Sequence, residues 1–558
     1  MPLEMDPNDR ERDASDQIES AGAPADSADS AESTDEVSAE EDFASDWDAT
    51  LAWMGRRWRL VILVATALLL AVACRDMHFN PDSIHYVDVA RTMLQERTVG
   101  TWHLTLDTRR LPETLLYWPP VYPALLAGLL GIGLSVQAAA WLVSVASYTA
   151  AAWILSFWLH RAALVIVAII AFIHISFLAG APFRAWSEGP YMPLMLGSLV
   201  CIAYAVAARS SRRALLLGLA AGVIAGLTML TRYTGITIVP ALIAAALLVP
   251  RSGDDEKAGS FRLKALIASL IGMAAVVTPW LARNFVLNQR LMGPERPPGE
   301  RPFTELITWF GFSVYADFGA ILLALIVAAV GYHALRRHER EGGERSGFLA
   351  ALVGAGVVCG LAHIVFTLLT FMLWEIDEPP TKRYFLPAYL SILMAGMAMM
   401  ARARLPENVL GRRAEIIVLL ALPLVIAPIF VGAAARDVTP PYTELDAWIE
   451  ENTAENDLIV AHRGWPIRFY TGRPVLQSGQ AADPPITDGE RVAEFLERFG
   501  DRFGDVYVIV GTSRAELLLE HWRAAGVHTE EVETIITRSH EYDAPRHREI
   551  EVHRVLRE

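Results

Sequence analysis

The stretch that decides the fold is Phe79–Pro123, which reads FNPDSIHYVDVARTMLQERTVGTWHLTLDTRRLPETLLYWPPVYP. It lies between apolar runs and carries Asp, Glu, His and Arg side chains along much of its length. Such a segment cannot lie in the hydrocarbon of a bilayer, where every backbone polar group needs a partner within the protein. We therefore expect it to lie on one face of a membrane and to hold a dense set of candidate catalytic groups.

The composition of the whole chain is that of a membrane protein. Of its 558 residues, 53% are hydrophobic, and several apolar runs are long enough to cross about 30 Å of hydrocarbon. Residues 1–50 differ, with 17 acidic residues and 2 arginines, and are predicted to be a disordered cytoplasmic tail. The three cysteines fall within or beside apolar runs, so the sequence predicts neither a disulfide framework nor a metal cluster.

The distribution of arginines predicts the topology. Arg56, Arg57 and Arg59 precede the first apolar run, which places the N-terminus inside. Segment 120–134 has only about 13 apolar residues. If it does not cross the membrane, the later basic loops all face the cytoplasm; if it does, they all face outward. We therefore predict an interfacial or re-entrant helix here, and about eleven spans: 58–75, 137–158, 162–180, 190–208, 214–230, 235–249, 265–281, 314–334, 348–372, 385–401 and 414–434.

The fold class that follows is mainly α, a polytopic bundle with surface helices in a first external loop, residues 76–136. The tail 1–50 precedes the transmembrane domain 51–436, and a small extracytoplasmic α/β domain occupies 437–558. Within that last domain the patterns predict strands at 458–461, 506–510 and 549–555 and helices at 490–499 and 514–525. The segment Tyr470–Pro474 is predicted to be a turn, without assigned chemistry.

Two acidic residues on the external side are candidates for catalysis. Asp82 is either the N-cap of a helix that begins at Ser83 or a general base, and the two roles are compatible. His85 and Asp88 follow on the same side of that helix, where a site and a solvated face explain them equally well. Glu188 is either a first-turn acid of the next helix or a wall of the same cavity as Asp82.

Four arginines at external helix ends run against the usual charge bias of membrane proteins: Arg184, Arg232, Arg283 and Arg383. One interpretation is that they extend to lipid headgroups. The other is that some of them converge on a phosphate, which the planar guanidinium group binds well. Tyr384 lies beside the last of them.

With these residues in view, the chain from about 80 to 558 resembles the GT-C superfamily of integral-membrane glycosyltransferases. The branch it most resembles holds the protein O-mannosyltransferases and the lipid A aminoarabinose transferase. The resemblance is carried by a series of short motifs: Pro81-Asp82 with Tyr86, Ala90 and Arg91; Trp118-Pro119-Pro120; Ser187-Glu188; Gly226–Arg232; Pro279-Trp280 with Arg283-Asn284; Arg383–Pro387; and Tyr470–Pro474. Many members have an Asp-Glu pair where this chain has Asp82-Ser83, so the sugar and the acceptor are not carried over.

The resemblance implies an inverting transfer of a sugar from a polyprenyl-phosphate donor to a lipid, glycan or protein acceptor at the extracytoplasmic face. Asp82 would be the catalytic base, and Glu188 would arrange donor or acceptor. His85, Tyr384 and the four arginines are the candidate substrate-binding residues. We expect an integral membrane protein in contact with lipids and not with nucleic acid; a divalent cation is left open. The alternatives are a transporter of lipid-linked glycans and a non-catalytic scaffold.

Overall fold

The computed structural model describes residues 59–75, 77–106, 108, 110–115, 118–159, 162–178, 181–248, 256–292, 344–373, 382–402, 443–461, 464–477, 489–539 and 546–556, with isolated positions at 304, 308 and 311. The predicted tail 1–50 and the predicted spans 314–334 and 414–434 fall outside these ranges. Within the described ranges, six helices are long and apolar enough to cross a membrane: α4 (Val136–Ser156), α6 (Glu188–Val206), α7 (Ser211–Met229), α9 (Glu256–Asn288), α12 (Glu344–Leu373) and α13 (Lys382–Arg402). They make this an integral membrane protein.

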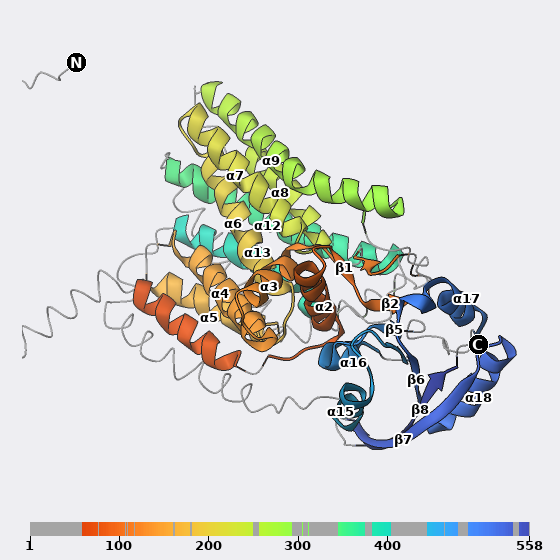
Figure 1. Ribbon diagram of the computed structural model, residues 1–558. Helices are drawn as coiled ribbons and strands as arrows, with labels where there is room; N and C mark the ends of the chain where they lie inside the picture. Colours follow the sequence, from red (N-terminus) through yellow and green to blue (C-terminus); the bar gives the residue numbers. More distant parts are fainter. Residues whose placement is uncertain are drawn as a thin grey trace, which may run out of the picture. The chain divides into compact units, whose positions relative to one another are not determined.

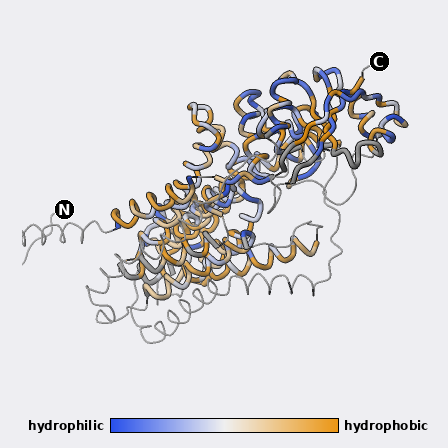
Figure 2. Tube along the Cα trace, turned by 90° about the horizontal axis from the view of Figure 1, so that it is seen from below, coloured by the Kyte–Doolittle hydropathy of each residue, from blue (hydrophilic) through white to orange (hydrophobic). Residues whose placement is uncertain are grey.

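Shorter apolar helices complete the described part of the bundle (Figure 1): Arg59–Ala73, α5 (Ala162–Leu178), and η1 (Tyr233–Thr237) with α8 (Ile238–Leu247). Helix α3 (Val121–Gly131) occupies the segment predicted not to cross. Its 11 residues span roughly 16 Å, about half of the hydrocarbon thickness. Figure 2 shows the hydrophobic residues along the helices and the hydrophilic ones gathered toward the C-terminal part of the chain.

Helices α7 and α9 pack with their backbones nearly in contact. A Cβ atom built at Gly222 would lie 1.9 Å from the Ser269 carbonyl oxygen, and one at Gly218 would lie 2.4 Å from that of Ala265. Small residues four apart allow such close approach between membrane helices, which in lipid are held largely by packing. Helix α7 ends at Met229, three residues before Arg232.

Helix α2 (Pro81–Gln95) carries Asp82, and its start differs from the prediction. The N-cap is Asn80, whose side-chain oxygen accepts from the Ser83 backbone N–H at 3.0 Å. Pro81 takes the first helical position, where its missing N–H costs nothing and its fixed φ suits the helix. The prediction that Asp82 is the N-cap is therefore wrong. Asp82 lies in the first turn, and its carboxylate is free for another partner.

The C-terminal part of the chain forms a six-stranded sheet in the order β2-β5-β4-β6-β8-β7. Strands β4 (Leu458–Ala461), β6 (Val506–Gly511) and β8 (Arg546–Val555) were predicted, whereas β5 (Val475–Gln477) and β7 (Thr529–Ser539) were not. Helices α17 (Gly489–Phe499) and α18 (Thr512–Ala524) match the two predicted helices, and α15 (Thr443–Asn452) and α16 (Gly464–Thr471) are additional. Of the predicted turn Tyr470–Pro474, the first two residues belong to the end of α16, and Gly472, with φ of 71°, follows the helix.

One strand of this sheet comes from the segment 76–136, which was predicted to be the first external loop. β2 (His103–Thr105) pairs in parallel with β5, with Leu104 opposite Leu476, and Leu104 is buried in the same core cluster as Trp522. A second small sheet in the loop joins β1 (Gly100–Thr101) to β3 (Glu113–Thr114). The segment 437–558 was predicted as a domain of its own, but its sheet is completed from residues that follow α2.

Candidate active site

Two acid–arginine pairs meet where α2, α6 and α13 come together. In the first, the Arg383 Nη1 atom lies 2.8 Å from the Asp82 Oδ2 atom. The Asp82 side chain remains 28% exposed, whereas that of Arg383 is 11% exposed. The pair joins residues 301 positions apart, and its carboxylate is within reach of solvent.

In the second pair the carboxylate is buried and the arginine is partly exposed. The Arg232 Nη1 atom lies 2.5 Å from the Glu188 Oε1 atom, and the Glu188 side chain is only 2% exposed. Glu188 belongs to the first turn of α6, as one of its two predicted roles required. Arg232 also donates to the Ser187 hydroxyl at 3.4 Å. The Glu188 carboxylate is thus buried against Arg232, whose own side chain is 20% exposed.

Tyr86 connects the two pairs. Its hydroxyl lies 3.0 Å from the Ser187 Oγ atom, and Tyr86 follows Asp82 by one helical turn. Burial raises the pKa of Tyr86; the charges of Asp82 and Glu188 raise it further, against an opposing effect of Arg232. Because Arg232 donates to the same Ser187 hydroxyl, Tyr86 and Ser187 link the helix of Asp82 to the Arg232–Glu188 pair.

Trp186 is a centre of the cationic part of this site. The Arg184 and Arg383 guanidinium carbons each lie 4.6 Å from its ring centroid. Arg383 also lies 4.9 Å from the Tyr384 ring centroid and donates to the Tyr384 hydroxyl at 3.0 Å. Aromatic rings attract cations in this geometry, so the tryptophan and the tyrosine fix the direction of the Arg383 fork.

Arg283 has a different role in the structure from Arg232 and Arg383. It donates to the backbone carbonyls of Val99 at 2.8 Å and Leu115 at 3.5 Å, both in the first external loop. The interpretation in which these three arginines extend to lipid headgroups is therefore wrong. Two pair with acids, and Arg283 holds the loop.

His85 and Asp88 are not on a solvated face, which corrects that alternative. The His85 ring stacks on Trp118 with centroids 4.8 Å apart and meets the His103 ring edge-on at 4.4 Å. Burial lowers the pKa of His85 to about 4, against the opposing charge of Asp88, so its imidazole is neutral at neutral pH. Asp88 is 2% exposed and pairs with Arg468 of α16.

Sequence reasoning missed three residues that support the site. Trp186 directly precedes the Ser187-Glu188 motif and was not predicted to have a role. His363 was not among the predicted site residues, yet its ring contacts the Tyr384 carbonyl at 3.0 Å and the Thr237 hydroxyl at 3.3 Å. Arg468 had no recognisable signal. Among the described residues, no three His, Cys, Asp or Glu side chains are grouped to hold a metal ion.

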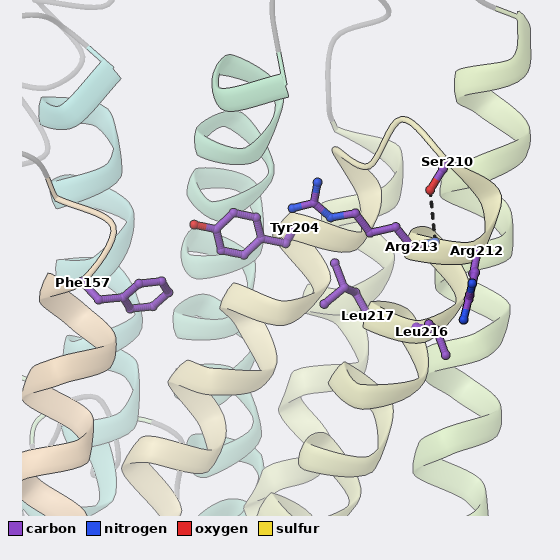
Figure 3. Close-up of a pocket in the computed structure, with 7 residues that line it drawn as sticks. All are labelled: Phe157, Tyr204, Ser210, Arg212, Arg213, Leu216 and Leu217. Atoms are coloured by element: carbon purple, nitrogen blue, oxygen red, sulfur yellow. Dashed lines mark hydrogen bonds between the residues drawn. The ribbon is translucent and has the colours of Figure 1, made fainter. Parts of the chain in front are cut away.

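A groove of about 470 Å³ lies at the far end of α7, lined by Phe157, Tyr204, Ser210, Arg212, Arg213, Leu216 and Leu217 (Figure 3). The 19 residues of α7 place it roughly 28 Å from Arg232. Figure 3 shows Arg213 extending toward Tyr204, with Phe157 across from them. The groove is separate from the acid–arginine site.

The fold matches that of solved membrane glycosyltransferases. ArnT from Cupriavidus metallidurans in the apo state superposes with a TM-score of 0.55 at 14% identity, over 90% of this chain and 98% of that one. The same protein bound to undecaprenyl phosphate gives a TM-score of 0.54 at 13% identity, over 89% and 98%. The chain has a GT-C fold. No family model and no curated protein matches the sequence itself.

The match confirms the predicted fold class in its main part, a membrane bundle with the architecture of ArnT. An oligosaccharyltransferase from Archaeoglobus fulgidus is also similar, at a TM-score of 0.47 and 14% identity over 81% of this chain and 68% of that one. The fold assignment rests on the two ArnT structures, and at these identities they establish the fold alone.

Proposed function

We propose that this protein is an inverting glycosyltransferase that moves a sugar from a polyprenyl phosphate to an acceptor hydroxyl at the extracytoplasmic face of the membrane. The observation that carries the proposal is the Asp82–Arg383 pair: a partly exposed carboxylate beside a guanidinium group held by two aromatic rings. The fold supports it, because ArnT with the same architecture has been solved with undecaprenyl phosphate bound.

In the proposed reaction, the acceptor oxygen attacks the anomeric carbon while its proton passes to the Asp82 carboxylate. The bond between that carbon and the phosphate oxygen breaks, and the polyprenyl phosphate leaves with its electron pair and negative charge. Arg383 and Arg232 stabilise this charge where it develops. Glu188 keeps Arg232 oriented from its buried position.

The Asp82–Arg383 pair gives this scheme an order of events. With no substrate bound, each side chain neutralises the other at 2.8 Å. An arriving phosphate competes for the guanidinium group, since Arg binds phosphate and carboxylate oxygens with the same fork. The carboxylate then loses its partner and becomes available to the acceptor hydroxyl.

The test uses the purified protein in lipid nanodiscs. Binding of undecaprenyl phosphate should weaken by tenfold or more in Arg383→Lys, which keeps the charge but loses the fork. Lys264→Arg, on α9 and bonded to Ser211 at the far end of α7, is the matched control and should bind normally. Transfer is followed with synthetic undecaprenyl-phosphate sugars. Equal binding by wild type and Arg383→Lys, together with no transfer from any donor tested, would sink the proposal.

A further inference from the structure

We infer that the Asp88–Arg468 ion pair makes the C-terminal domain a positioning element for Asp82, with Asp88 and Arg468 as positioning residues. The inference rests on the proposed role of Asp82 as base. It assigns a role to a domain that contributes none of the four residues of the acid–arginine pairs.

The first step is that both carboxylate oxygens of Asp88 accept hydrogen bonds. Its Oδ1 atom accepts from the Arg468 Nε atom at 2.7 Å. Its Oδ2 atom accepts from the Thr101 hydroxyl at 2.6 Å, the Trp102 backbone N–H at 2.8 Å and that of His103 at 3.3 Å. Burial opposes ionisation, but Arg468 and these hydrogen bonds hold the pKa of Asp88 below its usual value. One carboxylate thus joins α2, the strand that follows it and α16.

The second step is the extent of the contact between α16 and α2 (Figure 1). Arg91, one turn after Asp88, donates to the Phe469 carbonyl at 3.1 Å. Phe79, just before α2, packs on the Phe469 ring with centroids 4.9 Å apart. Residues before, within and near the end of α2 therefore all contact one turn of the domain. Strand β2 extends this attachment into the sheet, where the Val475 N–H donates to the Trp102 carbonyl at 3.0 Å.

The third step concerns what this attachment fixes. Asp82 precedes Asp88 by six residues, roughly 9 Å along the helix. One end of α2 is held to the membrane bundle through Arg383, and its middle is held to the domain through Arg468. Because α2 is attached to the domain, a displacement of the domain relative to the membrane bundle would also displace the Asp82 carboxylate. Proximity effects are steep, and a shift of 1 Å can cost about 10²-fold in rate.

Stability alone does not account for such a pair. Removing two charges from water costs several kcal/mol, and well-packed apolar residues often stabilise a protein as well or better. The Arg468 and Asp88 side chains are only 7% and 3% exposed, so this desolvation is nearly complete. What the pair adds is a single defined register between domain and helix.

The experiment compares Arg468→Met with Arg473→Met, a matched arginine of the same domain. Arg473 donates to Thr453 and Thr471 within the domain and makes none of the contacts to α2 described above. In full-length protein in nanodiscs, Arg468→Met should lower kcat by about 10²-fold at unchanged KM for the donor. Binding of undecaprenyl phosphate should stay normal, because Arg232 and Arg383 are intact. Arg473→Met should keep its kcat after correction for the folded fraction.

A second readout separates this inference from the proposed function. Hydrogen exchange of the peptide covering residues 82–95 should accelerate in Arg468→Met and not in Arg473→Met. If wild type transfers no sugar and exchange is still faster in Arg468→Met, the proposed function is refuted while the coupling between the domain and α2 stands. Equal kcat and equal exchange in the two variants would overturn the inference. Should Arg468→Met fail to fold, Arg468→Lys keeps the charge but loses the Nε donor, and is expected to show the same pattern more weakly.

Discussion

At the scale of single residues, Asp82 and Asn80 separate catalysis from helix capping. Asp82→Asn keeps the volume of the side chain and leaves the cap, which Asn80 supplies. The variant should fold and insert, and its transfer rate should fall by 10²–10⁴-fold, the usual loss for a positioned base. Asn80→Ala should do the reverse, costing about 1 kcal/mol of stability with the carboxylate retained. Transfer rates measured in membranes at matched expression distinguish a catalytic role from a capping role. A near-normal rate in Asp82→Asn would exclude Asp82 as the base.

Asp446 predicts a pH dependence of stability in the C-terminal domain. It is 8% exposed, and neither carboxylate oxygen has a hydrogen-bond partner among the residues that the structure describes. Burial, with Glu450 nearby, raises the pKa of Asp446 to about 8. The folded state therefore holds a proton that the unfolded state releases above about pH 4, so its contribution to stability is lost as pH rises from about 4 to about 8.

The measurement is thermal unfolding of Asp446→Asn and wild type at pH 5 and pH 8. The melting temperature of wild type should drop more between the two, and the variant should be the more stable at pH 8. Asp501→Asn, at an exposed acid, is the control and should follow wild type. Parallel curves for Asp446→Asn and wild type would contradict the assignment.

How much of the site the sequence predicts depends on the range of each interaction. The prediction that Asp82, Glu188, Arg232 and Arg383 share one face of the membrane follows from local charge and hydropathy. The error at the N-cap was avoidable, because proline at the first helical position identifies Asn80 as the cap. The pairing of Asp82 with Arg383 spans 301 residues, and no local pattern encodes it.

At the scale of elements, the close contact between α7 and α9 predicts that one added methyl group at Gly222 lowers the stability of the protein. Gly222→Ala would place its Cβ atom 1.9 Å from the Ser269 carbonyl oxygen, so the helices must move apart. We expect a loss of about 1–3 kcal/mol, as for other overpacked sites. Gly128→Ala in α3 is the control, since nothing lies within 4 Å of its added Cβ and alanine favours a helix. Unfolding temperatures in detergent compare the two, and equal values would show that α7 and α9 adjust freely.

Most described helices were predictable because a membrane span is a long, uniform signal. Each predicted span within the described ranges corresponds to a helix, with bounds shifted by a few residues; the longest extension is that of α9. Strand β2 was missed for the opposite reason. Three residues give no measurable alternation, and the partner that makes them a strand, β5, is written some 370 positions later.

At the scale of the whole molecule, the topology makes a prediction that the fold leaves open. Charge bias places the α6–α7 turn at Ser210 inside and the C-terminal domain outside. A cysteine at Ser210 should be protected from an impermeant maleimide in intact cells, and one at exposed Glu531 should react. The native cysteines give little background, since Cys74 and Cys359 are buried and Cys201 is half-buried. Labelling at position 210 from outside would reverse the topology.

Because β2 pairs with a strand that is synthesised much later, the sheet cannot be completed early in biosynthesis. Thr105 leaves the ribosome about 370 residues before Val475, which at 5–20 residues per second is roughly 20–75 s. Throughout that interval the strand partner of Leu104 has not been synthesised. For nearly all of it Arg468, the partner of Asp88, is also missing, so the nascent loop exposes an apolar strand and an unpaired charge. Release from the ribosome before residue 475, as by a premature stop codon, should therefore leave the loop as a substrate for quality-control proteases even when the bundle has inserted.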